Sequence, residues 1–450
     1  MIVIFIGIIS LFFVIFCLKY PKCMFLFVLF FIIVWPDYIV YKYEDLPGLT
    51  PSRFFLLLFS LSMLIRFILC FEKTNWIIKK IIKHKGIRQI LLLLIAFFTL
   101  QIISSILNSH EIKKSLFAST NNIITGFFLT IFVIYLFNNK QEIRKIIYVL
   151  LFCGIFINIV AMIEWINNRP LFMNYLLTAN EYTIQASIGK MRDGSYRLMS
   201  VFSNALVYAH YLLLMFPLGF YLLNISKNIF LKFITVLYLI SNIIFVVKTG
   251  SRAGLLLIIL TPLIFYYFNF MSHNKCKIKR NILNFIIIII GILFIFWAIC
   301  NVNTFVELTT IGLPSGIESS TIGRIMQYEF GIHAFFLSPL LGYGVNEAVK
   351  LVYPFKSIDS YFLTILLEVG FLGLFIYIYF NIKLFKLFLN KKSGHFLEEK
   401  YIVISIAYIL IFYTILSIDK ISSIYFVLIG MGLSIVLNKK QNGKKYNQIP

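Results

Sequence analysis

ILLLLIAFFTLQIISSIL, residues 90–107, carries no charged side chain and is about long enough to cross the hydrocarbon of a bilayer as a helix. Hydrophobic residues make up 60% of the 450 and charged residues only 13%, a balance that excludes a soluble globular protein. The chain therefore predicts an all-α polytopic membrane helical bundle of about 12–13 transmembrane helices, residues 1–450 forming one integral membrane domain. The predicted runs are centred near residues 10, 32, 62, 97, 127, 156, 212, 240, 262, 291, 371, 409 and 429.

The charges between these runs are distributed unequally. When the loops are taken alternately, one set holds 26 cations and four acids, and the other holds 14 cations and 13 acids. Cytoplasmic loops of membrane proteins carry the excess of Lys and Arg, so we expect the basic set, with the basic tail 438–450, to be cytoplasmic. This sidedness explains the net charge of +23 without a nucleic-acid partner. The basic set comprises residues 19–22, 72–88, 138–145, 225–232, 271–280, 383–400 and the tail after 437.

Two long polar segments, 167–200 and 301–358, fall in the opposite set and are predicted to be external loops. Irregular backbone is tolerated outside the hydrocarbon, so these loops are where a membrane enzyme or receptor is expected to act. The external set is poor in lysine but holds six of the ten arginines: Arg53, Arg169, Arg192, Arg197, Arg252 and Arg324. Because a guanidinium binds phosphate through two parallel hydrogen bonds, this bias predicts recognition of an oxyanion.

The second loop contains the pattern of an amphipathic helix that ends at Ser338-Pro339 and is followed by a turn on Gly342 and Gly344. Such a helix, lying across the outer mouth of the bundle, suits a lid or substrate platform; a surface helix with a packing role is the alternative. Its candidate N-caps are Ser319, Ser320 and Thr321.

Four segments occur in order along the second half: RLMSVFSNALVYAHYL (197–212), TGSRAGLLL (249–257), GRIMQYEFGIHAFFLSPLLGYGVNEA (323–348) and IDSYFLTILLEVGFLGL (358–374). Together, over about 195–380, they resemble the O-antigen polymerase and O-antigen ligase superfamily. The resemblance implies a multi-pass protein of the bacterial inner membrane that transfers glycans from polyprenyl diphosphate carriers on the periplasmic face, with no metal or other cofactor. It implies donor and acceptor glycans on such carriers, membrane lipids and, as a candidate partner, a chain-length regulator protein.

The resemblance assigns the diphosphate to Arg197, Arg252 and Arg324, whose charge would stabilise the leaving group. For each arginine the alternative is an interfacial side chain among lipid head groups. Ligases of the superfamily carry a histidine where this chain has Asp359, so polymerisation of lipid-linked repeats is favoured over ligation to a lipid A core. A lipid-linked glycan transporter is the rival from another class.

The attacking sugar hydroxyl needs a group that accepts its proton. Asp359 is the first candidate, although an aspartate there also suits the N-cap of the next helix. Glu329 and His333, four residues apart on the predicted amphipathic helix, form a second candidate pair. Glu368 lies inside an apolar run and is expected to have a structural hydrogen-bond partner, with Gly370 allowing close approach.

Overall fold

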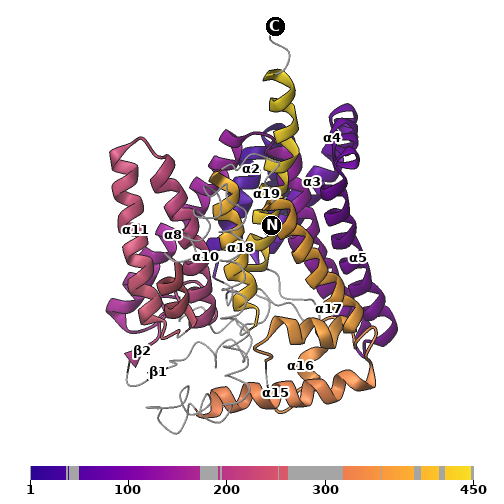
Figure 1. The fold of residues 1–450 in the computed structure, drawn as a ribbon, viewed down its shortest axis with the longest axis vertical. Helices are drawn as coiled ribbons and strands as arrows, with labels where there is room; N and C mark the ends of the chain where they lie inside the picture. The colour runs from indigo at the N-terminus through magenta and orange to yellow at the C-terminus, as the bar shows by residue number, and fades with distance from the viewer. Residues whose placement is uncertain are drawn as a thin grey trace, which may run out of the picture.

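A computed structural model describes residues 2–36, 39, 50–172, 191–192, 195–251, 253–261, 318–355, 357–389, 397–414 and 421–446. Helices dominate these residues (Figure 1). The first half holds α1 (Ile2–Lys19), α2 (Pro21–Val34), α3 (Pro51–Leu69), α4 (Phe71–Lys83), α5 (Lys85–Asn108), α6 (Ile112–Ile123), the π-helical turn η1 (Ile124–Phe128), α7 (Leu129–Leu136) and α8 (Lys140–Asn167). The second half holds α10 (Ala205–Ile225), α11 (Ile229–Lys248), α15 (Glu318–Leu337), α16 (Ala348–Leu351), α17 (Tyr361–Phe388), α18 (Leu397–Phe412) and α19 (Ile421–Tyr446).

Eight segments among the described residues are long and apolar enough to span a membrane, so the chain is a multi-pass helical membrane protein, as predicted. The predicted runs near 262 and 291 lie outside the described residues, and each of the others falls on a described helix. The strands described are two residues each, β1 (Met191–Arg192) and β2 (Ser195–Tyr196), paired antiparallel.

The bundle is assembled from helices that are distant in sequence. The closest packing joins α5 to α17, α7 to α19, and α10 to α18. Most of α10 is enclosed by other helices, and its tyrosines Tyr208, Tyr211 and Tyr221 are fully buried. By contrast, α3 and α11 leave most of their apolar side chains at least partly exposed, as an outer wall in a lipid environment requires.

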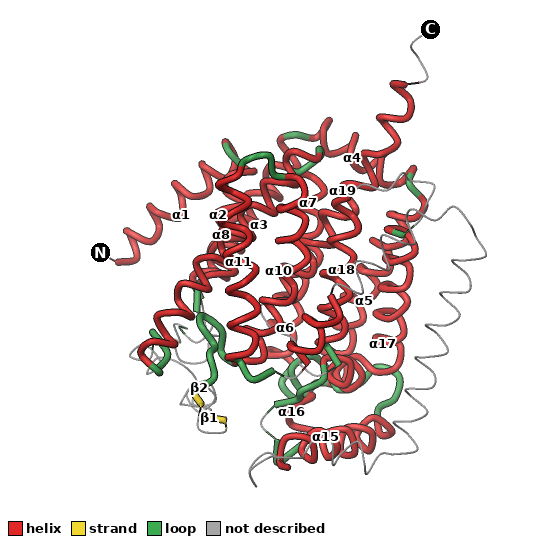
Figure 2. The backbone as a smooth tube through the Cα atoms, turned by 60° about the vertical axis from the view of Figure 1, so that its left-hand side comes forward, coloured by secondary structure: helices red, strands yellow, loops and turns green. Residues whose placement is uncertain are grey.

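Where the structure describes them, members of the two predicted sets of loops lie at opposite ends of the bundle. In Figures 1 and 2, α4 and the C-terminal part of α19 lie at one end, and α15, α16 and the β1–β2 hairpin lie at the other. Contacts between segments follow the same division, since Lys22 pairs with Glu142 and Lys80 Nζ donates to Asn438 Oδ1 at 2.7 Å. Both contacts join members of the basic set, which supports the alternation of spans inferred from the charges.

At the opposite end, α15 runs across the bundle rather than along it (Figure 1). It packs on α17 and α16, and it ends at Leu337 as predicted, directly before Ser338-Pro339. The prediction for its start was wrong, because Glu318 is already helical and the three residues proposed as N-caps (Ser319, Ser320, Thr321) lie inside the helix.

The membrane helix α17 is broken at Gly370, whose φ of 72° and ψ of −170° are not helical. The turn predicted at 339–344 fills the break: Tyr343 N and Gly344 N each donate at 2.9 Å, to Leu367 O and Glu368 O respectively. Phe371 N donates to Pro339 O at 2.8 Å in return. Non-helical backbone at membrane depth is tolerated when protein groups satisfy it, which is the role of this turn.

Candidate functional site

The first part of the candidate site joins α15 to the start of α17. Arg324 Nε lies 3.1 Å from Asp359 Oδ2, so two of the predicted site residues, 35 positions apart, form an ion pair. Both side chains remain about one-third exposed, at 32% for Arg324 and 36% for Asp359, and are accessible to a ligand. The contact uses Nε of Arg324, while the fork formed by its terminal Nη groups is the part that binds phosphate best.

Gln327, one turn after Arg324 on α15, holds the segment that carries Asp359. Its Nε2 donates to Ser357 O at 3.1 Å, and its Oε1 accepts from Asp359 N at 3.0 Å. The side chain is only 6% exposed, so these bonds are shielded from water. Gln327 was not among the site residues predicted from the sequence. Its spacing of three residues from Arg324, which places both on one face of a helix, was the available signal.

Asp359 is not the N-cap of α17, and that alternative from the sequence was wrong. Ser360 takes the position, with its Oγ accepting from Leu363 N at 3.4 Å. Both residue types favour helix N-caps, but only one residue can fill the position. The Asp359 carboxylate therefore faces Arg324 instead of the helix end.

Glu329 and His333 are separate from this ion pair. With about 100° of rotation per residue, Glu329 and His333 lie about 140° and 180° around α15 from Arg324. Both are exposed, and no hydrogen bond or ion pair joins them in the part of the chain that the structure describes. The structure thus brings Arg324 to Asp359 and places this second candidate pair on the opposite face.

The second part of the candidate site is formed by Arg197 and the end of α11. Arg197 Nε donates to Thr249 O at 2.7 Å, and Leu198 N donates to Lys248 O at 3.4 Å. Thr249 is followed by Gly250, with a φ of 63°, and by Ser251, whose Oγ accepts from Gly254 N at 3.2 Å. Arg252 follows Ser251 in the sequence but is outside the described residues.

Aromatic packing connects the helices that carry the two parts. Tyr361, two residues after Asp359, donates its N–H to Tyr413 O at 2.9 Å, and the two rings lie 4.6 Å apart. His210 of α10 stacks on Phe412 with ring centroids 4.6 Å apart and meets the edge of Tyr413 at 5.9 Å. The starts of α10 and α17 are therefore both fixed to the end of α18, and the segment carrying Arg197 leads directly into α10.

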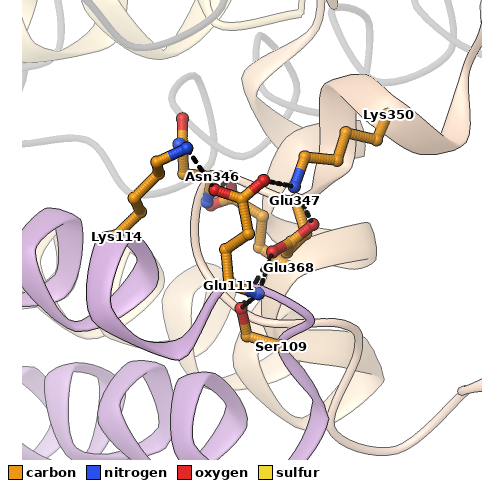
Figure 3. A network of polar contacts seen from close by, with 7 residues as sticks. All are labelled: Ser109, Glu111, Lys114, Asn346, Glu347, Lys350 and Glu368. Atoms are coloured by element: carbon orange, nitrogen blue, oxygen red, sulfur yellow. Dashed lines mark hydrogen bonds and ion pairs between the residues drawn. The ribbon is translucent and has the colours of Figure 1, made fainter. Parts of the chain in front are cut away.

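A polar network connects the α5–α6 loop and α6 to α16 and α17 (Figure 3). Lys350 Nζ lies 2.8 Å from Glu111 Oε1 and 2.9 Å from Glu347 Oε2, and Ser109 Oγ donates to Glu347 at 2.9 Å. Asn346 N donates to Glu368 Oε1 at 2.7 Å, so Glu368 has the structural partner predicted for it.

Charge fixes the protonation states in this network. Hydrogen bonds from Lys114 and Lys350 lower the pKa of Glu111 to about 2. Burial opposes ionisation of Glu347, but hydrogen bonds from Lys350 and Ser109 outweigh it and lower the pKa of this carboxyl. The same contacts to Glu111 and Glu347 raise the pKa of Lys350. Both carboxylates and the ammonium are therefore charged at neutral pH.

The described residues contain no group of three or more His, Cys, Asp or Glu side chains placed to hold a metal ion. The groups gathered at the α15 end are guanidinium, carboxylate and amide side chains. Guanidinium groups bind phosphate or carboxylate, and a carboxylate can accept a proton from a hydroxyl.

The fold and site define a polytopic helical membrane protein with an arginine–carboxylate site at one end of its bundle. Residues 233–378 match the family described as O-antigen ligase, which supports the resemblance to the O-antigen ligase and polymerase superfamily. The matched segment includes Arg252, Arg324 and Asp359, whereas Arg197 precedes it. No curated protein matches the chain.

Proposed function

We propose that the protein is a membrane glycosyltransferase that polymerises polyprenyl diphosphate-linked oligosaccharide repeats into a surface polysaccharide. The observation that carries the proposal is the ion pair of Arg324 with Asp359 at the end of the bundle where α15 lies, inside the O-antigen ligase-like segment. It sets a group that binds phosphate beside a group that accepts a proton.

In the proposed reaction, the acceptor hydroxyl attacks C1 of the donor sugar while the bond from C1 to the phosphate oxygen breaks. The hydroxyl proton passes to Asp359, and the polyprenyl diphosphate leaves with its electron pair. Arg324, Arg252 and Arg197 stabilise the charge that grows on the diphosphate. A direct displacement of this kind inverts the anomeric centre. Glu329 and His333, on the other face of α15, take no part in this scheme.

The protein is proposed to lie in the bacterial inner membrane, with the α15 end on the periplasmic side and the basic C-terminal tail in the cytoplasm. Donor and acceptor would reach the site from the membrane, because both are carried on polyprenyl lipid. A chain-length regulator is the proposed protein partner.

The proposal is tested by replacing Arg324 and Arg252 separately with alanine and separating the surface glycan by length. Removing one preorganised donor typically costs about 10²–10³ in rate, so we expect the ladder to collapse towards single repeats. Arg53→Ala is the matched control, because Arg53 belongs to the same external set but lies at the start of α3. A normal ladder in both site variants, at normal protein level, would contradict the proposal.

Ligation is the second candidate, supported by the description of the matching family. Gene deletion separates the two reactions. Loss of a polymerase leaves acceptors bearing single repeat units, whereas loss of a ligase leaves finished polymer on the polyprenyl carrier.

Transport is the third candidate, because broken membrane helices occur in transporters and α17 is broken at Gly370. Here, however, the Leu367 and Glu368 carbonyls at the break accept hydrogen bonds from the turn at 339–344. Such backbone pairing is what a break with a structural role requires. Purified protein that lengthens lipid-linked repeats in detergent, where no second compartment exists, would exclude pure transport.

A further inference from the structure

Glu164 is a fully buried carboxylate in the last turn of α8, and it binds the segment that carries Arg197. Its Oε1 accepts from the Tyr196 hydroxyl at 2.6 Å and from Met199 N at 3.1 Å. Its Oε2 accepts from Ser200 N at 2.5 Å. The Glu164 side chain therefore binds the residue before Arg197 and two residues that follow it.

The held segment has a conformation that the chain would not adopt without support. Ser200 has a φ of 53°, in the left-handed region that is uncommon for residues other than glycine. Its Oγ also donates to Ile157 O at 2.7 Å, so α8 binds the segment through two of its own residues. Fixed in this way, the segment directs Arg197 to Thr249 O, at the turn that leads to Arg252.

We propose that Glu164 is a positioning residue, which acts through Arg197 by fixing its segment against the end of α11. The inference rests on the proposed function, because it takes Arg197 as a ligand of the donor diphosphate. Glu164 itself is fully buried, so it has no surface that a substrate could contact. A glutamate carboxyl group offers two oxygens that together accept three hydrogen bonds here, which suits it to this role.

Glu164→Gln is the informative substitution because it preserves size and shape. Both carboxylate oxygens accept hydrogen bonds, so an amide must turn its NH₂ group towards at least one N–H or O–H donor. The amide NH₂ group then faces another hydrogen-bond donor, and we expect the segment that carries Arg197 to be held less firmly. Glu142→Gln is the matched control, since it is the same change in the first turn of the same membrane-spanning helix, at the end opposite to Glu164.

The first readout does not depend on enzymatic activity. Val201→Cys places a thiol at a fully buried position next to Ser200, in full-length protein in membranes. We expect a membrane-impermeant maleimide to label this cysteine at least about tenfold faster when Glu164→Gln is also present, because a buried donor left without an acceptor is costly. Protein without the added cysteine gives the background. Equal labelling in the Glu164→Gln and Glu142→Gln backgrounds would overturn the proposal.

The second readout is transfer from lipid-linked donor by the purified protein. We expect Glu164→Gln to raise the KM for donor, and we expect no further loss when it is combined with Arg197→Ala. Losses that multiply in the double variant would show that Glu164 does not act through Arg197 and would overturn the inference. If the parent protein transfers no glycan at all, the proposed function fails, while the labelling result still decides whether Glu164 holds the segment.

Discussion

At the scale of single residues, the neighbours of Asp359 decide what its carboxylate can do. Ser360 caps α17, and Gln327 binds the Asp359 backbone, so the carboxylate is left to Arg324. Two adjacent residues, Asp359 and Ser360, were both suitable N-caps by type. The sequence could not assign the cap, because the choice depends on where α15 lies.

These adjacent positions therefore give opposite predictions. Asp359→Asn keeps the size but removes the charge, and we expect transfer activity to fall about 10²–10⁴-fold with little change in melting temperature. Ser360→Ala removes the cap and should cost about 0.5–2 kcal/mol of stability, with activity retained per folded molecule. Transfer assays and thermal melts of both purified variants provide the check, and an active Asp359→Asn protein would remove Asp359 from the mechanism.

The network around Lys350 gives a pH prediction. The pKa of Glu111 is about 2 in the folded protein against an ordinary 4.5, so its contribution to stability is complete above pH 4.5 and is lost as the pH falls towards 2. Between about pH 5 and about pH 3, we expect the melting temperature of Glu111→Gln to fall less than that of the parent. Glu72→Gln, at an exposed glutamate of α4, is the control. An identical pH dependence in Glu111→Gln and the parent would show that Glu111 is not the group responsible.

At the scale of elements, the sequence predicted the membrane helices better than their irregularities. Long apolar runs identified α3, α5, α8, α10 and α11, because length and hydropathy largely determine whether a helix can span. The end of α15 was predicted from Ser338-Pro339, a local signal. The break in α17 was not, because Gly370 adopts its backbone conformation only when the turn at 339–344 supplies partners from elsewhere in the chain.

Gly370→Ala tests this break directly. A Cβ at residue 370 would lie 2.3 Å from Leu340 O, and the backbone conformation alone, with φ 72° and ψ −170°, costs about 1–3 kcal/mol for a residue other than glycine. We expect a clear loss of melting temperature together with loss of activity. Gly323→Ala is the control, because its Cβ would meet only Phe355 Cε1 at 3.5 Å, an ordinary contact. If the two variants have equal stability, the backbone at Gly370 is not constrained as described.

At the scale of the whole molecule, the two ends of the bundle differ in charge and in chemistry. Each ion pair joins residues of one set of loops: Lys22 pairs with Glu142 at one end, and Arg324 pairs with Asp359 at the other. The sequence predicted this division because charge bias survives without any knowledge of packing. It could not predict which arginines meet which acids, because those partners come from segments tens of residues apart.

The orientation of the bundle is testable by labelling intact cells. Leu337→Cys, at the exposed end of α15, is expected to react with a membrane-impermeant maleimide from outside. Lys79→Cys, on α4 at the other end, should react only after the membrane is permeabilised. Protein without an added cysteine gives the background. The reverse pattern would invert the proposed topology and place the candidate site in the cytoplasm.

The break in α17 has a consequence for biogenesis. Residues 339–344 are synthesised before α17, so the hydrogen-bond partners for the Leu367 and Glu368 carbonyls already exist when that helix leaves the ribosome. Without them, the unwound backbone at Gly370 would enter hydrocarbon with unsatisfied polar groups, at several kcal/mol each. Correct insertion of this span therefore depends on the preceding loop. A variant protein that lacks the loop would be a substrate for quality-control proteases before any glycan is bound.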